Sequence, residues 1–251
     1  MNTQVVSGDG PVLSARGLCK SYGTLVVVKN VDLDVMPGEL LGVLGPNGAG
    51  KTTLFNLIGG DVHADAGQVR LQGRALDRLR PFERCRAGVG RTYQIPRPYG
   101  GMTVLENLLV AALFGGGMAE RAATVHCMEV LERCGLAARA NQLAGALTLL
   151  DRKRLELARA LASRPRLLLL DEIAGGLTDA EADQLIELVA SLKKQRIAIV
   201  WIEHVLRAVM AVADRVLVLN FGEQIASGSP QAVMGHPDVR RIYLGREAVA
   251  A

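Results

Sequence analysis

The sequence predicts an α/β fold with an inserted helical region, and three observations support this prediction. An apolar run at residues 40–44 leads into a glycine-rich loop and then into an amphipathic helix from residue 54. Two later runs, at residues 167–170 and 197–202, are continuously apolar, as strands buried on both faces of a sheet are. Between these halves, residues 102–161 have a helical pattern. A chain of 251 residues is long enough for one such domain.

Composition narrows the classes of function. Hydrophobic residues make up 49% of the chain, which supports a large buried core, whereas an aromatic content of 4% argues against a surface that stacks nucleic-acid bases. The net charge of +4 is compatible with an acidic ligand or a membrane surface. The four cysteines show neither metal-ligand spacing nor a disulfide framework, which favours a reducing compartment. We see no signal peptide, and the longest apolar stretch, residues 108–119, is too short to span a bilayer, so we expect any membrane role to come through a partner.

The amino-terminal part alternates strands and turns. Residues 1–10 read as a loose tail, and residues 12–35 have a strand pattern in which apolar and polar positions alternate. A short strand is expected between glycines at residues 67–73. Pro81 suits the first position of a short helix, because proline lacks the N–H that a helix start leaves unpaired. Residues 88–94 then read as another strand.

The central part is predicted to be helical. After a segment rich in proline and glycine, Thr103 and Glu106 have the spacing of a capping box at a helix start. Glycines at residues 115–117 interrupt this helix, and a second helical pattern covers residues 118–134. Together with the helix that ends near residue 161, these patterns indicate an inserted helical subdomain.

The α/β pattern resumes with the strand at residues 167–170. Thr178 and Glu181 form another capping box, which opens a helix that reaches about residue 194. The remaining elements, in chain order, are a strand at 197–202, a helix at 205–213, strands at 215–220 and 223–226, and a short helix from Ser229 and Pro230. Residues 236–251 read as a tail.

The glycine-rich loop fits the phosphate-binding pattern G-x-x-x-x-G-K-[ST] and lies between a strand and a helix, as that motif requires. Glycines allow a tight turn, so that backbone N–H groups and the positive end of the helix point at one anion. Lys51 is expected to reach the β- and γ-phosphates, and the Thr52 hydroxyl to hold Mg²⁺. The predicted nucleoside-triphosphate site comprises Gly45, Pro46, Asn47, Gly48, Ala49, Gly50, Lys51, Thr52 and Thr53.

Polar side chains follow the other apolar strands. Asp171 and Glu172 end the run at residues 167–170, and a strand beside the phosphate-loop strand would bring both carboxylates to the site. Asp171 is expected to hold Mg²⁺ through water, and Glu172 to polarise the attacking water. His204 also ends a strand and could contact a γ-phosphate. Gln94 could reach the metal or the water as an uncharged amide.

These residues resemble the motifs of the nucleotide-binding subunit of an ATP-binding-cassette (ABC) transporter, over residues 13–245. The matching motifs are Walker A at 45–53, Walker B with the catalytic glutamate at 167–172, the Q-loop at Gln94, the switch histidine at His204, the D-loop at 175–178 and, at Tyr22, the aromatic residue that stacks on adenine. The resemblance implies ATP and Mg²⁺ as ligands. It assigns hydrolysis to Lys51, Gln94, Glu172 and His204, and the metal to Thr52, Gln94 and Asp171.

The same resemblance implies a P-loop NTPase fold of the ABC ATPase type. A RecA-like core and an amino-terminal antiparallel β subdomain would occupy residues 1–96 and 162–235, the helical subdomain residues 97–161, and a tail residues 236–251. The implied partners are transmembrane permease subunits, a second ATPase subunit (a copy of this chain or a related paralogue) and, indirectly, an extracytoplasmic binding protein, with no nucleic acid. The implied location is the cytoplasmic face of the inner (plasma) membrane, as a peripheral subunit.

Finer features resemble the ATPases of branched-chain amino-acid importers. They lie at residues 90–94, 102–107, 174–178, 228–239 and 243–245. Urea and amide importers and the lipopolysaccharide-export ATPase share parts of this pattern and stay open as alternatives. A soluble ABC protein that acts on DNA or ribosomes is a third interpretation, against which the single cassette and the low aromatic content argue.

One motif departs from the family. The signature Leu-Ser-Gly-Gly-Gln is replaced at residues 147–151 by Leu-Thr-Leu-Leu-Asp. In the family, this loop of one subunit closes over the ATP of the other, so Thr148 would act in trans through its hydroxyl. Asp151 could turn back on the helix start in a capping box while Arg152 or Lys153 faces the phosphate. The alternative is a nucleotide-gated dimerisation module with weak hydrolysis. Ile173 also stands where the family has proline.

Arginines are frequent in one further span, where they could face phospholipid headgroups or a permease; a solvated surface is the simpler interpretation. They are Arg70, Arg74, Arg78, Arg80, Arg84, Arg86, Arg91 and Arg97.

Overall fold

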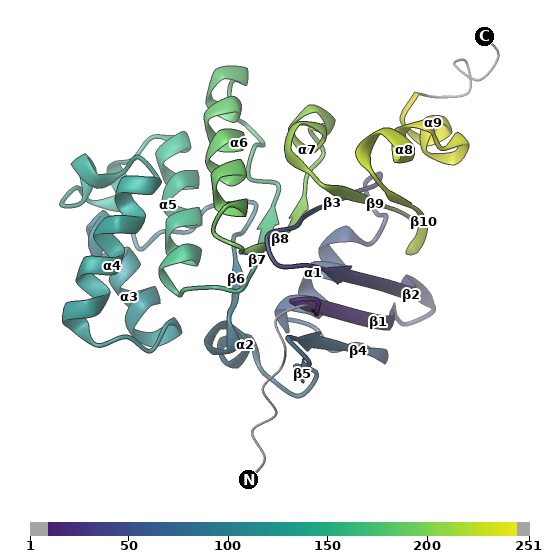
Figure 1. Ribbon diagram of the computed structural model, residues 1–251, viewed down its shortest axis with the longest axis horizontal. Helices are drawn as coiled ribbons and strands as arrows, with labels where there is room; N and C mark the ends of the chain where they lie inside the picture. The colour runs from purple at the N-terminus through teal and green to yellow at the C-terminus, as the bar shows by residue number, and fades with distance from the viewer. Residues whose placement is uncertain (1–9, 245–251) are drawn as a thin grey trace.

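The computed structural model describes residues 10–244 and contains two sheets (Figure 1). The antiparallel sheet has the strand order β2-β1-β4-β5. Its strands are β1 (Leu13–Tyr22), β2 (Leu25–Val35), β4 (Ala66–Leu71) and β5 (Arg74–Ala75). The second sheet has the order β10-β9-β3-β8-β7-β6 and is parallel except for β10. Its strands are β3 (Leu40–Leu44), β6 (Val89–Arg91), β7 (Leu167–Asp171), β8 (Ala198–Ile202), β9 (Arg215–Asn220) and β10 (Glu223–Gly228).

The helices surround the parallel sheet (Figure 1). The helices before β7 are α1 (Lys51–Gly59), α2 (Pro81–Ala87), α3 (Val104–Val110), the π-helical turn η1 (Ala111–Gly115), α4 (Glu120–Arg133), the 3₁₀ turns η2 (Ala137–Arg139) and η3 (Ala144–Ala146), and α5 (Leu149–Ala162). Those after it are α6 (Asp179–Lys193), α7 (Leu206–Val212), α8 (Pro230–Gly235) and α9 (Pro237–Leu244). None of the helices within residues 10–244 combines the length and the apolar character that a bilayer span requires.

The capping boxes predicted at Thr103 and Thr178 are both present. The side chain of each threonine accepts a hydrogen bond from the backbone N–H three residues later. In return, the Glu106 and Glu181 carboxylates accept a hydrogen bond from the backbone N–H of their threonine. Pro81 is the first residue of α2, as predicted.

Strand β7 shows why a continuous apolar run was needed here. Leu167 and Leu169 belong to the core that α1 shares with the antiparallel sheet, whereas Leu168 and Leu170 belong to the core beneath α3, α4, α5 and α6. Successive side chains of a strand point to opposite faces, so a strand between two layers must be apolar at every position. Helix α1 therefore lies between the two sheets and ties them together.

The registers align the carboxyl ends of three parallel strands. Val43 pairs with Ile202, and Asp171 pairs with Ile202, so the residues that follow β3, β7 and β8 emerge at one edge of the sheet. Loops at this edge are where ligands bind in open α/β sheets. The phosphate loop follows β3 at this edge.

Two predictions about element limits need correction. The strand predicted over residues 88–94 ends at Arg91. Thr92 still makes one backbone hydrogen bond to β7 (2.9 Å to the Leu169 oxygen), but the residues after it turn away from the sheet. The tail predicted from residue 236 contains α9, whose Val239 and Tyr243 lie one turn apart and pack against the core beside β9. The predicted amino-terminal tail, apart from Gly10, and the last seven residues lie outside the described range.

The arginine-rich span is not uniformly solvated, which corrects the sequence interpretation for two of its members. Arg84 is 2% exposed and donates from Nη1 to the backbone oxygens of Leu57 (2.6 Å) and Ile58 (2.9 Å), at the carboxyl end of α1. Arg91 is largely buried between carboxylates. Both side chains therefore form hydrogen bonds with residues of α1 instead of facing solvent.

Candidate functional site

The phosphate loop closes tightly before α1. Gly45 and Gly50 have φ angles of 151° and 100°, and a Cβ atom on Gly50 would lie 2.4 Å from the Val27 carbonyl oxygen. The Ala49 N–H donates to the Pro46 oxygen (3.1 Å), which fixes the turn. Gly50 caps α1 without a side-chain hydrogen bond, so the N–H groups of the first helical turn are directed at the loop. Such a loop can bind an anion.

Lys51 lies within this loop and is 7% exposed. Its Nζ donates to the backbone oxygens of Gly45 (2.7 Å) and Pro46 (3.0 Å). Burial lowers the pKa of Lys51, and the nearby Glu172 and Asp171 carboxylates oppose that shift. A pocket of about 190 Å³ opens here. It is lined by residues 47–53, Glu172 and Val27, which sequence reasoning did not identify.

The two predicted carboxylates lie at the end of β7, next to this pocket. Asp171 is 7% exposed, and burial raises its pKa, while Arg91 acts in the opposite direction. Glu172 has a φ angle of 46°, a left-handed conformation that is costly for a residue with a side chain. Its backbone N–H donates to the Ile202 oxygen at 2.9 Å, which joins the ends of β7 and β8.

Gln94 and His204 meet at the Glu172 carboxylate, although they come from different loops. Gln94 donates from Nε2 to Glu172 Oε2 at 2.6 Å, and His204 Nδ1 lies 3.5 Å from the same oxygen. His204 Nδ1 is also 3.3 Å from Glu203 Oε1. The site thus brings together three residues that the sequence suggested only as separate strand ends.

Glu203 and Lys153 support this arrangement; Glu203 was missed as a functional residue, and Lys153 was expected at a phosphate instead. Glu203 is 1% exposed, and its carboxylate accepts the N–H groups of Ala174 (3.1 Å), His204 (3.0 Å) and Val205 (3.3 Å). Lys153 Nζ donates to the Glu172 backbone oxygen at 3.3 Å. Burial lowers the pKa of Lys153, opposed by Glu203 and Glu172. The sequence signal for Glu203 was a carboxylate directly after an apolar strand.

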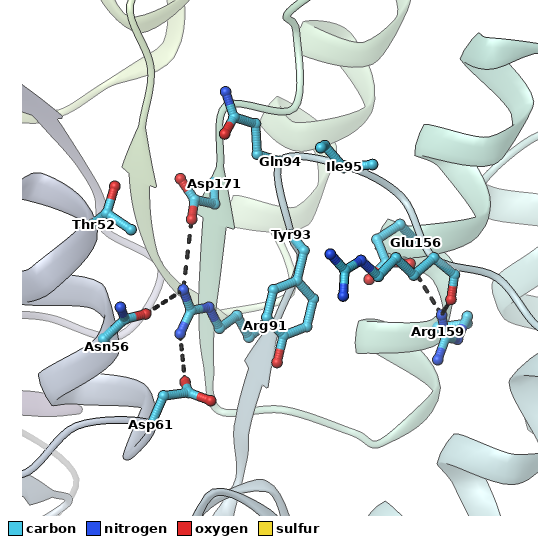
Figure 2. Close-up of a pocket in the computed structure, with 11 residues that line it drawn as sticks. Thr52, Asn56, Asp61, Arg91, Tyr93, Gln94, Ile95, Glu156, Arg159 and Asp171 are labelled. Atoms are coloured by element: carbon cyan, nitrogen blue, oxygen red, sulfur yellow. Dashed lines mark hydrogen bonds and ion pairs between the residues drawn. The ribbon is translucent and has the colours of Figure 1, made fainter. Parts of the chain in front are cut away.

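The residues predicted to hold Mg²⁺ line one pocket of about 550 Å³ (Figure 2). Thr52, Gln94 and Asp171 supply a hydroxyl, an amide and a carboxylate, which are the oxygen donors that Mg²⁺ prefers. Because the amide nitrogen of Gln94 already bonds Glu172, its carbonyl oxygen is the group left for a ligand. The donor set therefore fits magnesium.

Tyr22 and Thr148, which were predicted to contact nucleotide, line neither pocket. Tyr22 ends β1 and is 49% exposed, with Lys20 Nζ 5.6 Å from its ring centre. Thr148 is the N-cap of α5, and its proposed role in trans needs a second chain. Both roles stay predictions.

The variant signature loop is held by ion pairs rather than by a full capping box. Thr148 accepts the Asp151 N–H (3.3 Å), and its hydroxyl donates to the Asp151 carboxylate (3.0 Å). Asp151 is 4% exposed and pairs with Arg139 (2.8 Å) and Arg154 (3.5 Å). Its negative charge is thereby neutralised within the chain.

Lys153 is not directed to this helix start, and a phosphate contact by Arg152 in trans stays a prediction, because it needs a second chain. Arg152 donates to the Gly145 oxygen at 2.9 Å, and Lys153 donates to the backbone oxygen of Glu172. Leu149 is 46% exposed, so an apolar side chain lies where the family pattern has a small residue.

Comparison with known proteins gives consistent matches. The family model described as "ABC transporter" matches residues 28–175, and one described as "Branched-chain amino acid ATP-binding cassette transporter" matches residues 223–249. The chain is 40% identical to the high-affinity branched-chain amino acid transport ATP-binding protein LivG of Escherichia coli (strain K12) and 38% identical to BraF of Pseudomonas aeruginosa, in each case over 94% of this chain and 98% of the relative. A crystal structure of an ATP-binding cassette of an ABC transporter in its ADP conformation superposes with a TM-score of 0.86 at 30% identity, covering 94% of this chain and 99% of that one.

Proposed function

The chain belongs to the ABC transporter family as an ATP-binding cassette with ATPase activity, and from this premise we propose that it drives the import of branched-chain amino acids through a separate permease. The names of the relatives LivG and BraF and the match at residues 223–249 support this substrate class over urea, amides or lipopolysaccharide. The observation that carries the catalytic part is the convergence of Gln94 and His204 on Glu172, beside the buried Lys51.

The residues divide the chemistry as follows. Lys51 and the amides of residues 47–53 hold the phosphates, by charge and by oriented N–H groups. Thr52, Gln94 and Asp171 would hold Mg²⁺, which when bound neutralises charge on the transferred phosphoryl group. Glu172 orients and polarises the attacking water. His204, whose backbone N–H is fixed by Glu203, is positioned beside Glu172 to contact the γ-phosphate.

Replacing Glu172 by Gln tests this assignment. The amide keeps the size of the side chain but cannot act as a base, so we expect ATP turnover to fall by about 100-fold or more while ATP affinity stays within about twofold. Steady-state phosphate release and equilibrium ATP binding are the two measurements. Glu187→Gln, on the exposed face of α6, is the matched control and should change neither. Equal losses of binding and turnover would contradict the role of Glu172.

The assembly that we propose has two ATPase subunits, this chain and a copy or paralogue, on the cytoplasmic side of an inner-membrane permease fed by a binding protein. Within the chain, residues 97–161 would be the helical subdomain that transmits movement to the permease, and residues 1–96 and 162–235 the nucleotide-binding part. Uptake of radiolabelled leucine, in proteoliposomes with the permease and binding protein encoded by neighbouring genes, tests the substrate class. Uptake of urea instead of leucine would overturn it.

A second candidate function is a nucleotide-gated dimerisation module with weak hydrolysis. The observation that favours it is the start of α5, where Leu149 is exposed and Asp151 carries a paired negative charge. Turnover with the native permease, compared with the Glu172→Gln variant, separates the two functions. Equal near-zero rates for the two proteins would favour the dimerisation module, and a large difference would favour ATP-driven transport.

A further inference from the structure

Arg91 places a guanidinium between two carboxylates at the end of β6 (Figure 2). Its Nη1 lies 2.6 Å from Asp61 Oδ2, and its Nη2 donates to Asn56 Oδ1 at 2.8 Å. The same Nη2 lies 3.6 Å from Asp171 Oδ2. The side chains of Arg91 and Asp171 are 10% and 9% exposed, so water screens the attraction between the two charges only weakly. Arg91 therefore contacts the carboxylate that the proposed function assigns to Mg²⁺.

The three contacts differ in kind. Distances of 2.6 and 2.8 Å are direct hydrogen bonds, which anchor the guanidinium to the carboxyl-terminal end of α1 and the loop after it. A separation of 3.6 Å is too long for a hydrogen bond, so the contact with Asp171 is mainly electrostatic. The contact with Asp171 can weaken without breaking either anchor.

Asp171 needs a positive neighbour because it lies among other carboxylates. Glu172 and Glu203 are close enough to act on it, and all three acids carry the same charge when ionised. Lys153 faces Glu172 and Glu203, whereas the cations that face Asp171 itself are Arg91 and, from the phosphate loop, Lys51. Burial of like charges is unfavourable unless an opposite charge lies beside them.

We propose that Arg91 is a positioning residue that supplies the positive charge at Asp171 in the nucleotide-free chain, and that it stays anchored on Asn56 and Asp61 when magnesium and nucleotide bind there. The inference rests on the proposed function, in which Asp171 holds Mg²⁺ through water. Gln94, three residues after Arg91, holds Glu172, so one short segment contacts both carboxylates of the site.

Loss of the Arg91 charge has two effects of known sign. The nucleotide-free chain becomes less stable, because the carboxylates repel each other without a counter-charge. Binding of Mg²⁺ at the site becomes more favourable, because the ion no longer competes with a guanidinium for Asp171. Since the metal would be held through a water molecule, the charge matters more than the angle of the carboxylate.

The test compares Arg91→Gln and Arg91→Lys with Arg97→Gln as the matched control. Arg97 lines the same pocket from an exposed position, so its replacement removes the same charge without touching Asp171. Two quantities are measured for each protein: the unfolding temperature without nucleotide, and the ratio of ATP affinity in excess Mg²⁺ to ATP affinity in EDTA. The second is an equilibrium measurement that needs no turnover.

We expect Arg91→Gln to lower the unfolding temperature by several degrees and to raise the affinity ratio by about threefold or more. Arg91→Lys should restore most of both values, because it keeps the charge and loses only the forked hydrogen bonds. An unchanged or smaller ratio in Arg91→Gln, or an equal change in Arg97→Gln, would overturn the proposal. A wild-type chain that binds ATP in neither buffer would overturn the proposed function instead, and the unfolding temperatures would still decide the role of Arg91.

Discussion

At the scale of single residues, the site depends on a few buried charges whose partners are backbone groups. Lys51 donates to two carbonyl oxygens of its own loop. Glu203 accepts from two N–H groups of its own loop and from one N–H group of the loop after β7. Such bonds hold loops in place, because a buried charge without partners is costly. The loops are therefore positioned before a ligand arrives.

Replacing Lys51 by Met keeps the packing of the side-chain stem and removes the ammonium. We expect ATP affinity to fall at least about tenfold, since a charge-assisted contact with phosphate is lost. The unfolding temperature should stay the same or rise, because burial already disfavours the charged form of this lysine. Lys194→Met, at an exposed position, is the control for both measurements. Unchanged ATP affinity would contradict the phosphate-loop assignment.

Replacing Glu203 by Gln leaves one amide nitrogen facing N–H donors. We expect a loss of about 1–3 kcal/mol in the free energy of unfolding, the cost of buried unsatisfied polar groups. We also expect a lower kcat with little change in KM for ATP, because His204 and the Glu172 turn lose their support. Urea denaturation and steady-state kinetics measure the two effects. A variant with normal kcat would show that Glu203 is structural alone.

The sequence predicted three side chains that the structure brings together, but not the side chains that support them. Gln94, Glu172 and His204 each lie in the loop that follows a strand, and the order of strands in a parallel sheet brings such loops together. Arg91 and Lys153 could not be assigned in this way. Both are common surface residue types, and their burial depends on helix packing that no local pattern encodes.

At the scale of elements, the start of α5 was the least predictable feature. The spacing of Thr148 and Asp151 predicted a capping box, and Thr148 does cap the helix. The Asp151 carboxylate, however, accepts from the Thr148 hydroxyl and pairs with Arg139 and Arg154, and it does not complete the capping box. A carboxylate with two cationic partners, one from the η2 turn and one from the next turn of α5, is held more strongly than by one hydrogen bond to the helix backbone. Local capping rules contain no information about a partner such as Arg139, which belongs to another element.

Replacing Asp151 by Asn tests the ion pairs at this helix start. We expect the free energy of unfolding to fall by about 1 kcal/mol, because the bonds to Asp151 are charge-assisted and its carboxylate is buried, although Arg139 is partly exposed. ATP affinity of the isolated chain should not change. Asp183→Asn removes an exposed carboxylate that pairs with Arg207 and should cost less than about 0.5 kcal/mol. Equal costs for the two variants would show that Asp151 is not a buried partner.

At the scale of the whole molecule, the predicted fold is confirmed, from the strand before the phosphate loop to the hairpin of β9 and β10. Long apolar runs and glycine turns carry most of this information. The limits of β6 and the helix α9 were missed, because an edge strand and a short terminal helix depend on what they pack against. The assignment of separate subdomains stays a prediction.

Two buried thiols predict how stability changes at high pH. Burial raises the pKa of Cys127 to about 11 and of Cys134 to about 12, from an ordinary value of 9.0. The folded state keeps both thiols protonated while the unfolded state ionises, so stability falls as pH rises above about 9. The slope should be about 1.4 kcal/mol per pH unit for each thiol, up to its folded pKa. Urea denaturation between pH 8 and about 10.5 measures this slope, and a Cys127→Ala, Cys134→Ala chain should show a smaller one. An identical slope in that chain would refute the assignment.

The guanidinium of Arg84 at the carboxyl end of α1 has a consequence for the opposite end of the same helix. A helix carries partial negative charge where it ends, and Arg84 compensates that pole while the pole at the phosphate loop stays positive. Nine residues of helix separate the two, or about 13 Å. The two poles of α1 are therefore unequal: the negative pole is compensated by a side chain of the same molecule, and the positive pole is left for an anion at the phosphate loop.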